Sequence, residues 1–495
     1  MSNRPETNKQ SCPVYKKCGG CQLQNLSYPE QLEFKQKKVE KLLKRFCTVE
    51  KIIGMKTPYH YRNKVQAAFY TDKKGKIISG VYQSGSHHVV GIDSCQTEDV
   101  IADKIIVAVR KLLPSFRMTT YNEDTGKGFL RHILVKRGFA TNQIMLVLVT
   151  GTPVFPSKNN FVKAILKQFP EITTIVQNIN PYRTNLVLGD HQKVLYGKGY
   201  IEDILCGCRF RISPKSFYQI NPVQTEVLYG KAIEFANLKG NETVLDTYCG
   251  IGTIGIIAAK NGAGNVIGAE LNGDAVRDAI VNARANNLKN IRFYKADAGE
   301  FMREAADEDE KPDVVFMDPP RAGSDRKFLD SLIKMSPKKV VYVSCNPETL
   351  ARDLAYLTQN SPYKAQKIQP VDMFPHTAHI ETVVLLSHKK PDGHINVKVE
   401  FGEGEGKVPL DNIAKRAESY KPKERVTYKM IKEYIEAKYG FKVHTAYIAE
   451  VKRDLGLPMY DAPNAVEELK QPRKHPTAEK VEAIKDALKH FNIVE

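Results

Sequence analysis

The residues from 242 to 259, ETVLDTYCGIGTIGIIAA, constrain the fold of this chain more than any other stretch. They predict a strand that ends at Asp246, a glycine-rich turn, and a helix that begins near Thr253. The turn has the spacing G-x-G-x-x-G, formed by Gly250, Gly252 and Gly255. Glycines at this spacing let the backbone at a helix N-terminus approach a nucleotide-containing ligand closely. We therefore expect such a ligand at this turn.

Strands and helices continue to alternate from about residue 241 to 390, which predicts a doubly wound α/β domain. We expect Glu270 to end the second strand, at a distance from the glycines that suits an acid binding ribose hydroxyls. A nicotinamide or flavin cofactor satisfies this pattern, and S-adenosylmethionine satisfies it equally. The glycine motif alone does not separate these ligands.

The stretch DVVFMDPPRAG, residues 313 to 323, favours methyl transfer. We expect a strand to end at Asp318, after which Pro319 and Pro320 stiffen the turn. An acid followed by two prolines at a strand end is typical of methyltransferases that act on nucleic-acid bases. It is unusual for an oxidoreductase.

A thiol and a carboxylate follow at the ends of two further predicted strands. Cys345 lies at the end of VVYVS, where α/β sheets carry their chemistry, although cysteine alone also suits a packing role. Glu381 begins an apolar strand, where a carboxylate is costly unless it is paired or functional. A thiolate that adds to carbon 6 of uracil activates carbon 5, and a base must then remove the carbon-5 proton. We predict Cys345 as this nucleophile and Glu381 as this base.

Three cysteines near the N-terminus predict a metal centre. Cys12, Cys18 and Cys21 lie in CPVYKKCGGC, where three thiols can converge on one metal. The candidates for a fourth ligand are Cys47 and Cys95, and Cys95 lies in a turn, which suits a ligand better. Ligation by thiolates alone suits either zinc or an iron–sulfur cluster, and the spacing does not choose between them.

The charge of the chain favours a nucleic-acid partner. The sequence has 74 basic and 56 acidic residues, a formal net charge of +18, and nearly all of the excess lies before residue 390. From about residue 55 to 211 it predicts seven short strands, the last within residues 185–190. Basic residues of this region, among them Arg131 and Lys136, mix with aromatic ones, a composition that suits RNA.

The sequence indicates a cytoplasmic protein without membrane contact. It has no run of about 18 apolar residues that would predict a transmembrane helix, and its first residues lack the apolar core of a signal peptide. No obligate protein partner is evident from the sequence.

Seven motifs, in order, resemble the RNA uracil-5-methyltransferase family over residues 12 to about 388. They are CPVYKKCGGC, FYQINPVQTEVLY, DTYCGIG, GAELN, DPPRAG, VSCNPETLARD and HTAHIETV. The resemblance is to the iron–sulfur-containing type that methylates 23S ribosomal RNA with S-adenosylmethionine. It implies a Rossmann-like class I methyltransferase domain, and it implies the same roles for Cys345 and Glu381 as the chemistry above.

The resemblance also implies ligand contacts. It places the cofactor against one residue in each of four motifs, namely Gln219, Tyr248, Glu270 and Asp318. It implies a 4Fe–4S cluster on Cys12, Cys18, Cys21 and Cys95. RNA cytosine-5 methyltransferases usually place a cysteine after the proline of the DPP-type motif, where this chain has Arg321, so uracil is favoured over cytosine.

Three regions are expected. Residues 1–210 would form a strand-rich basic RNA-binding domain that carries the cysteine cluster, and residues 211–390 the methyltransferase domain. Residues 391–495 would form a helical C-terminal extension for packing or partner contact, with helices near residues 427–440, 444–456 and 477–491. Family members often carry a β-barrel RNA-binding domain before the cluster. Only eleven residues precede Cys12 here, so we expect the central region to capture RNA.

The predicted function is formation of 5-methyluridine in ribosomal RNA. Three alternatives stay open. The first is the same chemistry on transfer RNA, and the second is a nucleotide-dependent oxidoreductase with an iron–sulfur cluster. The third is a non-catalytic RNA-binding protein, for which Cys345→Ala would change nothing measurable.

Overall fold

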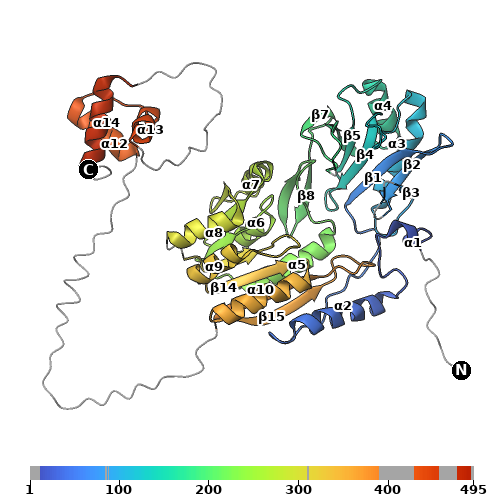
Figure 1. The fold of residues 1–495 in the computed structure, drawn as a ribbon, viewed down its shortest axis with the longest axis horizontal. Coiled ribbons are helices and arrows are strands. Elements are labelled where there is room, and N and C mark those ends of the chain that lie inside the picture. The colour runs from blue at the N-terminus through green and yellow to red at the C-terminus, as the bar shows by residue number, and fades with distance from the viewer. Residues whose placement is uncertain are drawn as a thin grey trace, which may run out of the picture. The chain divides into compact units, whose positions relative to one another are not determined.

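The computed structural model describes residues 12–83, 86, 88–184, 186–308, 311–388, 428–455 and 476–491. The chain divides after residue 394 into two compact units, which are considered one at a time (Figure 1). The sequence around Pro391 and Gly393 indicates a linker or an exposed hairpin, and it lies outside the described residues. The boundary expected near residue 210 stays a prediction, because the first unit is compact as a whole.

The second half of the first unit is built on a seven-stranded sheet in the order β12-β11-β10-β13-β14-β16-β15. Its strands are β10 (Thr243–Asp246), β11 (Asn265–Glu270), β12 (Ile291–Lys295), β13 (Val314–Met317), β14 (Lys339–Ser344), β15 (Tyr363–Val371) and β16 (Glu381–His388). Strands β10 to β14 pair in parallel, and β16 is antiparallel to both β14 and β15. The strand order reverses between β10 and β13, which is where sheets of this kind bind ligands.

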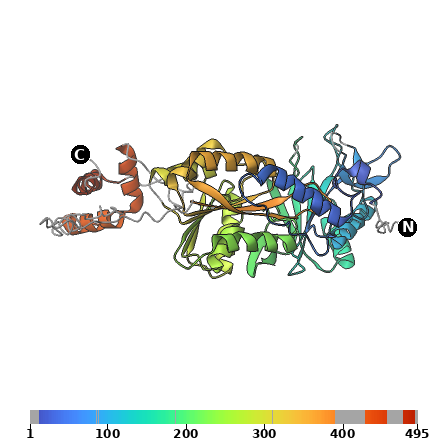
Figure 2. The same ribbon diagram turned by 90° about the horizontal axis from the view of Figure 1, so that it is seen from below.

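Helices cover both faces of this sheet (Figure 2). One face is covered by α5 (Pro222–Ala236), α6 (Thr253–Lys260) and α7 (Gly273–Ala285). The other is covered by α8 (Ala298–Asp307), α9 (Arg326–Met335) and α10 (Pro347–Asn360). Successive residues of β13 belong to the two cores in turn: Val314 and Phe316 face one core, Val315 and Met317 the other. Because side chains alternate across a strand, a sheet covered on both faces needs this continuous apolar run.

The first half of that unit contains a second seven-stranded sheet, in the order β3-β2-β1-β4-β5-β6-β7. Its strands are β1 (Lys64–Thr71), β2 (Ile77–Tyr82), β3 (Val89–Gly91), β4 (Leu130–Arg137), β5 (Ile144–Thr150), β6 (Ile172–Ile179) and β7 (His191–Tyr196). Two helices, α3 (Val100–Leu112) and α4 (Lys158–Gln168), share a core with one face of it. A hairpin of β8 (Ile201–Leu205) and β9 (Cys208–Ile212) leads towards the other sheet. We call the seven-stranded sheet β1–β7 the central sheet.

The last strand of this region lies later than expected, and two of its basic residues are buried. The seventh strand is β7 at residues 191–196 rather than within 185–190, because the Asn180 amide donates to the carbonyls of Leu186 and Val187 in place of a strand partner. Arg131 and Lys136 are 2% and 5% exposed, so they do not present their charge to RNA. The Arg131 guanidinium instead pairs with Glu123 at 2.9 Å.

The N-terminal segment packs against the C-terminal part of the first unit. It contains the short helix α1 (Tyr15–Cys18) and the helix α2 (Tyr28–Leu43), which lies alongside α10 and β15. Lys35 of α2 donates to the Asp372 carboxylate at 2.6 Å, and both side chains are fully buried. This ion pair ties α2 to the segment that runs from β15 into β16.

The second unit contains the three predicted helices, α12 (Tyr428–Tyr439), α13 (Thr445–Asp454) and α14 (Ala478–His490). They share a small apolar core that includes Ile435, Ile448 and Ile484. None of the described helices of the chain is long and apolar enough to span a membrane.

Candidate active site

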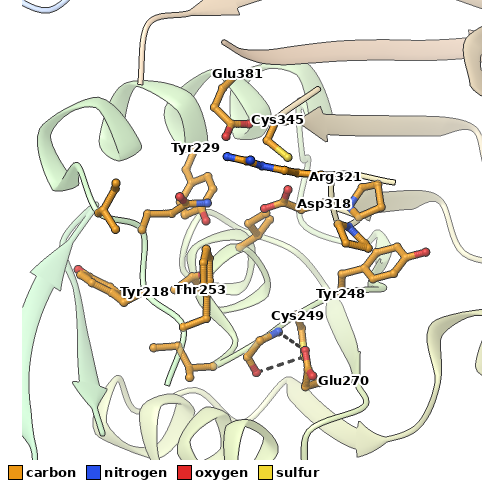
Figure 3. Close-up of a pocket in the computed structure, with 18 of the residues that line it drawn as sticks. Tyr218, Tyr229, Tyr248, Cys249, Thr253, Glu270, Asp318, Arg321, Cys345 and Glu381 are labelled. Carbon is orange, nitrogen blue, oxygen red and sulfur yellow. Dashed lines mark hydrogen bonds between the residues drawn. The ribbon is translucent and has the colours of Figure 1, made fainter. Parts of the chain in front are cut away.

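A cavity of about 500 Å³ opens at the carboxyl ends of β10, β13 and β14, at the point where the strand order reverses. The sequence predicted six residues for the reaction and the cofactor. All six line this cavity: Gln219, Tyr248, Glu270, Asp318, Cys345 and Glu381. Figure 3 labels all of them except Gln219. They come from six different segments of the chain, which the fold of the sheet brings together.

Cys345 and Glu381 are neighbours because their strands are paired. Strand β14 is antiparallel to β16, and Ser344 lies opposite Thr382. Cys345 directly follows β14 and Glu381 is the first residue of β16, so the two side chains enter the cavity side by side (Figure 3). Glu381 is 3% exposed, which is rare for a carboxylate.

Burial and mutual repulsion raise the pKa of the acids in this cavity. Burial raises the pKa of the Cys345 thiol to about 11, and the Glu381 and Asp318 carboxylates add to that shift. Burial also raises the pKa of Asp318 to about 7. It raises the pKa of Glu381 well above the usual range of glutamate, with Asp318 again adding to the shift. Perturbed acids that face one cavity are typical of catalytic sites.

Arg321 is the cation of the cavity, and the sequence analysis gave it no role in the site. Its guanidinium lies beside Cys345 and Glu381 and lowers the pKa of both, opposing the effect of burial (Figure 3). Its carbonyl accepts hydrogen bonds from the Asn346 amide at 3.1 Å and the Thr349 hydroxyl at 3.2 Å. The loop after β13 is thereby fixed to the loop after β14. In the sequence, the position of Arg321 directly after Pro319 and Pro320 was the feature that could have indicated its place in the site.

The glycine-rich turn closes the other end of the cavity. Gly252 has φ 83°, and a Cβ atom there would lie 2.7 Å from the Phe293 ring, so only glycine fits. The Glu270 carboxylate accepts the backbone N–H groups of Gly250 at 3.0 Å and Asn272 at 2.8 Å. These bonds hold the acid directly beside the turn, with its oxygens still able to accept further hydrogen bonds.

A second cavity, also of about 500 Å³, adjoins the first. Phe217, Gly250 and Glu270 line both cavities. A ligand held at Glu270 can therefore extend in either direction. Tyr229 and His379 also line the first cavity, and no sequence motif assigned either residue to the site.

The four cysteines predicted to bind a cluster are neighbours, but they are not arranged as a metal site. Cys21 lies within electrostatic range of Cys12, Cys18 and Cys95, and burial raises the pKa of the Cys21 thiol to about 12. Within the described residues, no group of three or more His, Cys, Asp or Glu side chains is arranged to hold a metal ion. Cys47 lies at the end of α2 with its thiol directed to its neighbour Thr48, so it is the weaker candidate for a fourth ligand.

This chain is similar to known RNA methyltransferases. The model of the family described as tRNA (uracil-5-)-methyltransferase matches residues 182–389. An uncharacterized RNA methyltransferase of Bacillus cereus is 44% identical over 388 residues, which cover 77% of this chain and 84% of that protein. One of Listeria monocytogenes is 46% identical over 379 residues, covering 76% of this chain and 83% of that protein.

A solved structure is similar over most of its length. It is the tRNA (uracil-54, C5)-methyltransferase of Pyrococcus abyssi in complex with S-adenosyl-L-homocysteine. The two proteins share 31% identity with a TM-score of 0.63, over 74% of this chain and 85% of the other. This similarity confirms the expected Rossmann-like class I methyltransferase fold with additional domains.

Proposed function

Because this chain belongs to the RNA uracil-5-methyltransferase family, we propose that it transfers a methyl group from S-adenosylmethionine to carbon 5 of uridine in RNA. The observation that carries the proposal is the placement of the Cys345 thiol beside the Glu381 carboxyl in one cavity. A transferase that methylates an amine needs neither a thiol nor this second acid. Carbon 5 of uracil needs both, because it is a poor nucleophile until carbon 6 is attacked.

Cys345 is the proposed nucleophile. Its thiolate adds to carbon 6, and the electron pair of the 5,6 double bond moves to carbon 5 and the O4 enolate. After carbon 5 has gained the methyl group, Glu381 as carboxylate takes the proton from carbon 5. The electrons of that C–H bond restore the double bond and expel Cys345 as thiolate. The product is 5-methyluridine, Cys345 is a thiolate again, and the carbon-5 proton is on the Glu381 carboxyl.

The residues around the cavity fit the cofactor. Glu270, beside the glycine-rich turn, has the position of an acid that binds ribose hydroxyls, and Gln219, Tyr248 and Asp318 line the same cavity. S-adenosylmethionine supplies the methyl group on a sulfonium, whose positive charge would lower the pKa of the acids around it. Arg321 has the same effect on Cys345 and Glu381 throughout the reaction.

Ribosomal RNA is the substrate we propose, on the resemblance of the N-terminal cysteine motif to the enzymes that methylate 23S ribosomal RNA. Transfer RNA is the second candidate. It is favoured by the description of the matching family and by the substrate of the similar Pyrococcus abyssi enzyme.

We also propose that Cys12, Cys18, Cys21 and Cys95 hold a 4Fe–4S cluster. Support comes from the all-thiol donor set and from the electrostatic proximity of Cys21 to the other three. Binding requires the sulfur atoms to move into ligand geometry, since they do not have it here. Protein purified without oxygen should contain iron and acid-labile sulfide, and Cys21→Ser should lose both while Cys47→Ser keeps them. Zinc in place of iron would favour the alternative metal, and protein without either would contradict the proposal.

The test of the main reaction uses RNA from a strain that lacks the enzyme. Ribosomal and transfer RNA are incubated separately with protein and S-adenosylmethionine, and 5-methyluridine is mapped by mass spectrometry. We expect new 5-methyluridine in ribosomal RNA with the wild type and with Cys47→Ala, but none with Cys345→Ala. Modification of transfer RNA alone would overturn the substrate, and methylation of another base would overturn the uracil chemistry.

A further inference from the structure

The segment from Ser213 to Ile220, which we call the 213–220 strap, lies between β9 and α5 without regular secondary structure. It borders both cavities: residues 217–220 line the first and residues 213–217 line the second. Gln219, one of the proposed cofactor contacts, belongs to it. The position of the strap therefore sets the shape of the space in which a cofactor would lie.

A buried lysine of the central sheet holds the first half of the strap. Lys136, in β4, is 5% exposed, and its Nζ donates to the carbonyls of Ser213 and Ser216, both at 2.8 Å. No carboxylate of the described residues lies within ion-pair distance of it. Burial lowers the pKa of Lys136 to about 7 and the Asp278 carboxylate opposes this shift, while the two carbonyls accept the hydrogen bonds of the buried amine. The Ser216 hydroxyl in turn donates to Asp278 of α7 at 2.6 Å.

A buried amide of the same sheet holds the second half. Asn63, directly before β1, is 4% exposed, and its side chain donates to the Gln219 carbonyl at 3.1 Å. Its backbone N–H donates to the Ile220 carbonyl at 2.9 Å, and its own carbonyl accepts from Arg137 at 2.8 Å. Four carbonyls of the strap are thus bound by two residues that the central sheet fixes.

We propose that Lys136 and Asn63 are positioning residues for cofactor binding, because they hold the 213–220 strap at the cavity from the central sheet. The inference rests on the proposed use of S-adenosylmethionine. It gives the central sheet a second role besides contact with RNA: its strands set the affinity of the methyltransferase half for its cofactor. Neither residue touches the cofactor in this proposal.

The test measures binding of S-adenosylhomocysteine to the purified full chain by isothermal titration calorimetry. Lys136→Met removes both donors to the strap, and Asn63→Asp replaces a donor with an isosteric acceptor. Lys193→Met is the control for loss of a central-sheet lysine, since Lys193 is exposed and donates to the carbonyl of Pro153 at 3.5 Å but not to the strap. We expect the dissociation constant to rise about tenfold in each test variant, which is the order of the loss of one hydrogen bond. The control should match the wild type.

The stoichiometry of binding separates positioning from misfolding, because unfolded protein lowers the number of sites without changing their affinity. In turnover, the test variants should raise the KM for S-adenosylmethionine while kcat at saturation stays within about twofold. Unchanged affinity in both variants would overturn the inference. If Lys136→Met does not fold, Asn63→Asp decides alone. A wild type that binds no S-adenosylhomocysteine would instead refute the proposed function.

Discussion

Cys345 and Glu381 lie opposite each other at the adjoining ends of two antiparallel strands. They are next to the register pair formed by Ser344 of β14 and Thr382 of β16. Strand pairing fixes Glu381, and Cys345 directly follows Ser344, the last paired residue of β14. A nucleophile and a base held on adjacent strands keep their separation while substrate enters and product leaves.

Glu381→Gln should trap the reaction after methyl transfer. The amide keeps the shape of the side chain but cannot take the carbon-5 proton, so Cys345 is not expelled. We expect the rate of product release to fall by about 100- to 10,000-fold and a methylated RNA–protein adduct to persist in a denaturing gel. Adding Cys345→Ala to this variant should abolish the adduct. A single Glu381→Gln variant that turns over at the wild-type rate would assign the base to another residue.

The reactivity of Cys345 should rise steeply with pH in the protein without ligands. Its pKa is raised to about 11, so the thiol is protonated at neutral pH, and only the thiolate reacts with iodoacetamide. Below that pKa the thiolate fraction, and with it the alkylation rate, should increase about tenfold per pH unit. Mass spectrometry of the Cys345 peptide between pH 7 and 9 measures this rate.

Two variants shift the same pH dependence in opposite directions. Arg321 lowers the pKa of the thiol, so Arg321→Gln should slow alkylation at each pH. Glu381 raises it, so Glu381→Gln should accelerate alkylation. A rate that does not change with pH in the wild type would mean that Cys345 is already a thiolate.

The strand ends of the active site could be predicted from the sequence because each is a local pattern. Asp246 and Glu270 end their strands, Asp318 directly follows one and Glu381 begins one, as expected from apolar runs broken by turn residues. Parallel strands bring their carboxyl ends to one edge of a sheet, which explains why Tyr248, Glu270, Asp318 and Cys345 share a cavity. Glu381 reaches the same edge because β16 is antiparallel, whereas Gln219 comes from the 213–220 strap.

Glu270→Ala should weaken cofactor binding while the glycine-rich turn stays in place but becomes less ordered. The carboxylate accepts the N–H groups of Gly250 and Asn272, so its loss leaves the turn less ordered as well as removing the partner for the ribose. We expect the KM for S-adenosylmethionine to rise at least tenfold, as for loss of one to two hydrogen bonds to a charged group, with RNA affinity unchanged in a filter-binding assay. Glu242→Ala is a suitable control, because Glu242 precedes β10 outside both cavities. An unchanged KM in Glu270→Ala would exclude the proposed ribose contact.

Contacts between distant segments could not be predicted in the same way. Lys136 is separated by 77 residues from Ser213, and Asn63 by 156 from Gln219, and neither contact leaves a periodic trace in the sequence. The basic character of Lys136 suggested an RNA contact, whereas the fold buries it. Composition gives the charge of a segment, but it does not show which of the charged residues are buried in the core.

Lys35→Met should destabilise the first unit, because it leaves the fully buried Asp372 carboxylate without its cation. Removing one member of a buried ion pair costs about 3–5 kcal/mol of unfolding free energy, which urea unfolding followed by circular dichroism measures. Asp372 keeps hydrogen bonds from the Tyr28 hydroxyl at 3.0 Å and the Phe374 N–H at 3.2 Å, so Lys35→Met with Asp372→Asn should recover part of the loss. Lys37→Met, on the exposed face of α2, should change stability by less than about 1 kcal/mol. If Lys35→Met unfolds at the same urea concentration as the wild type, the buried pair does not anchor the segment that leads to Glu381.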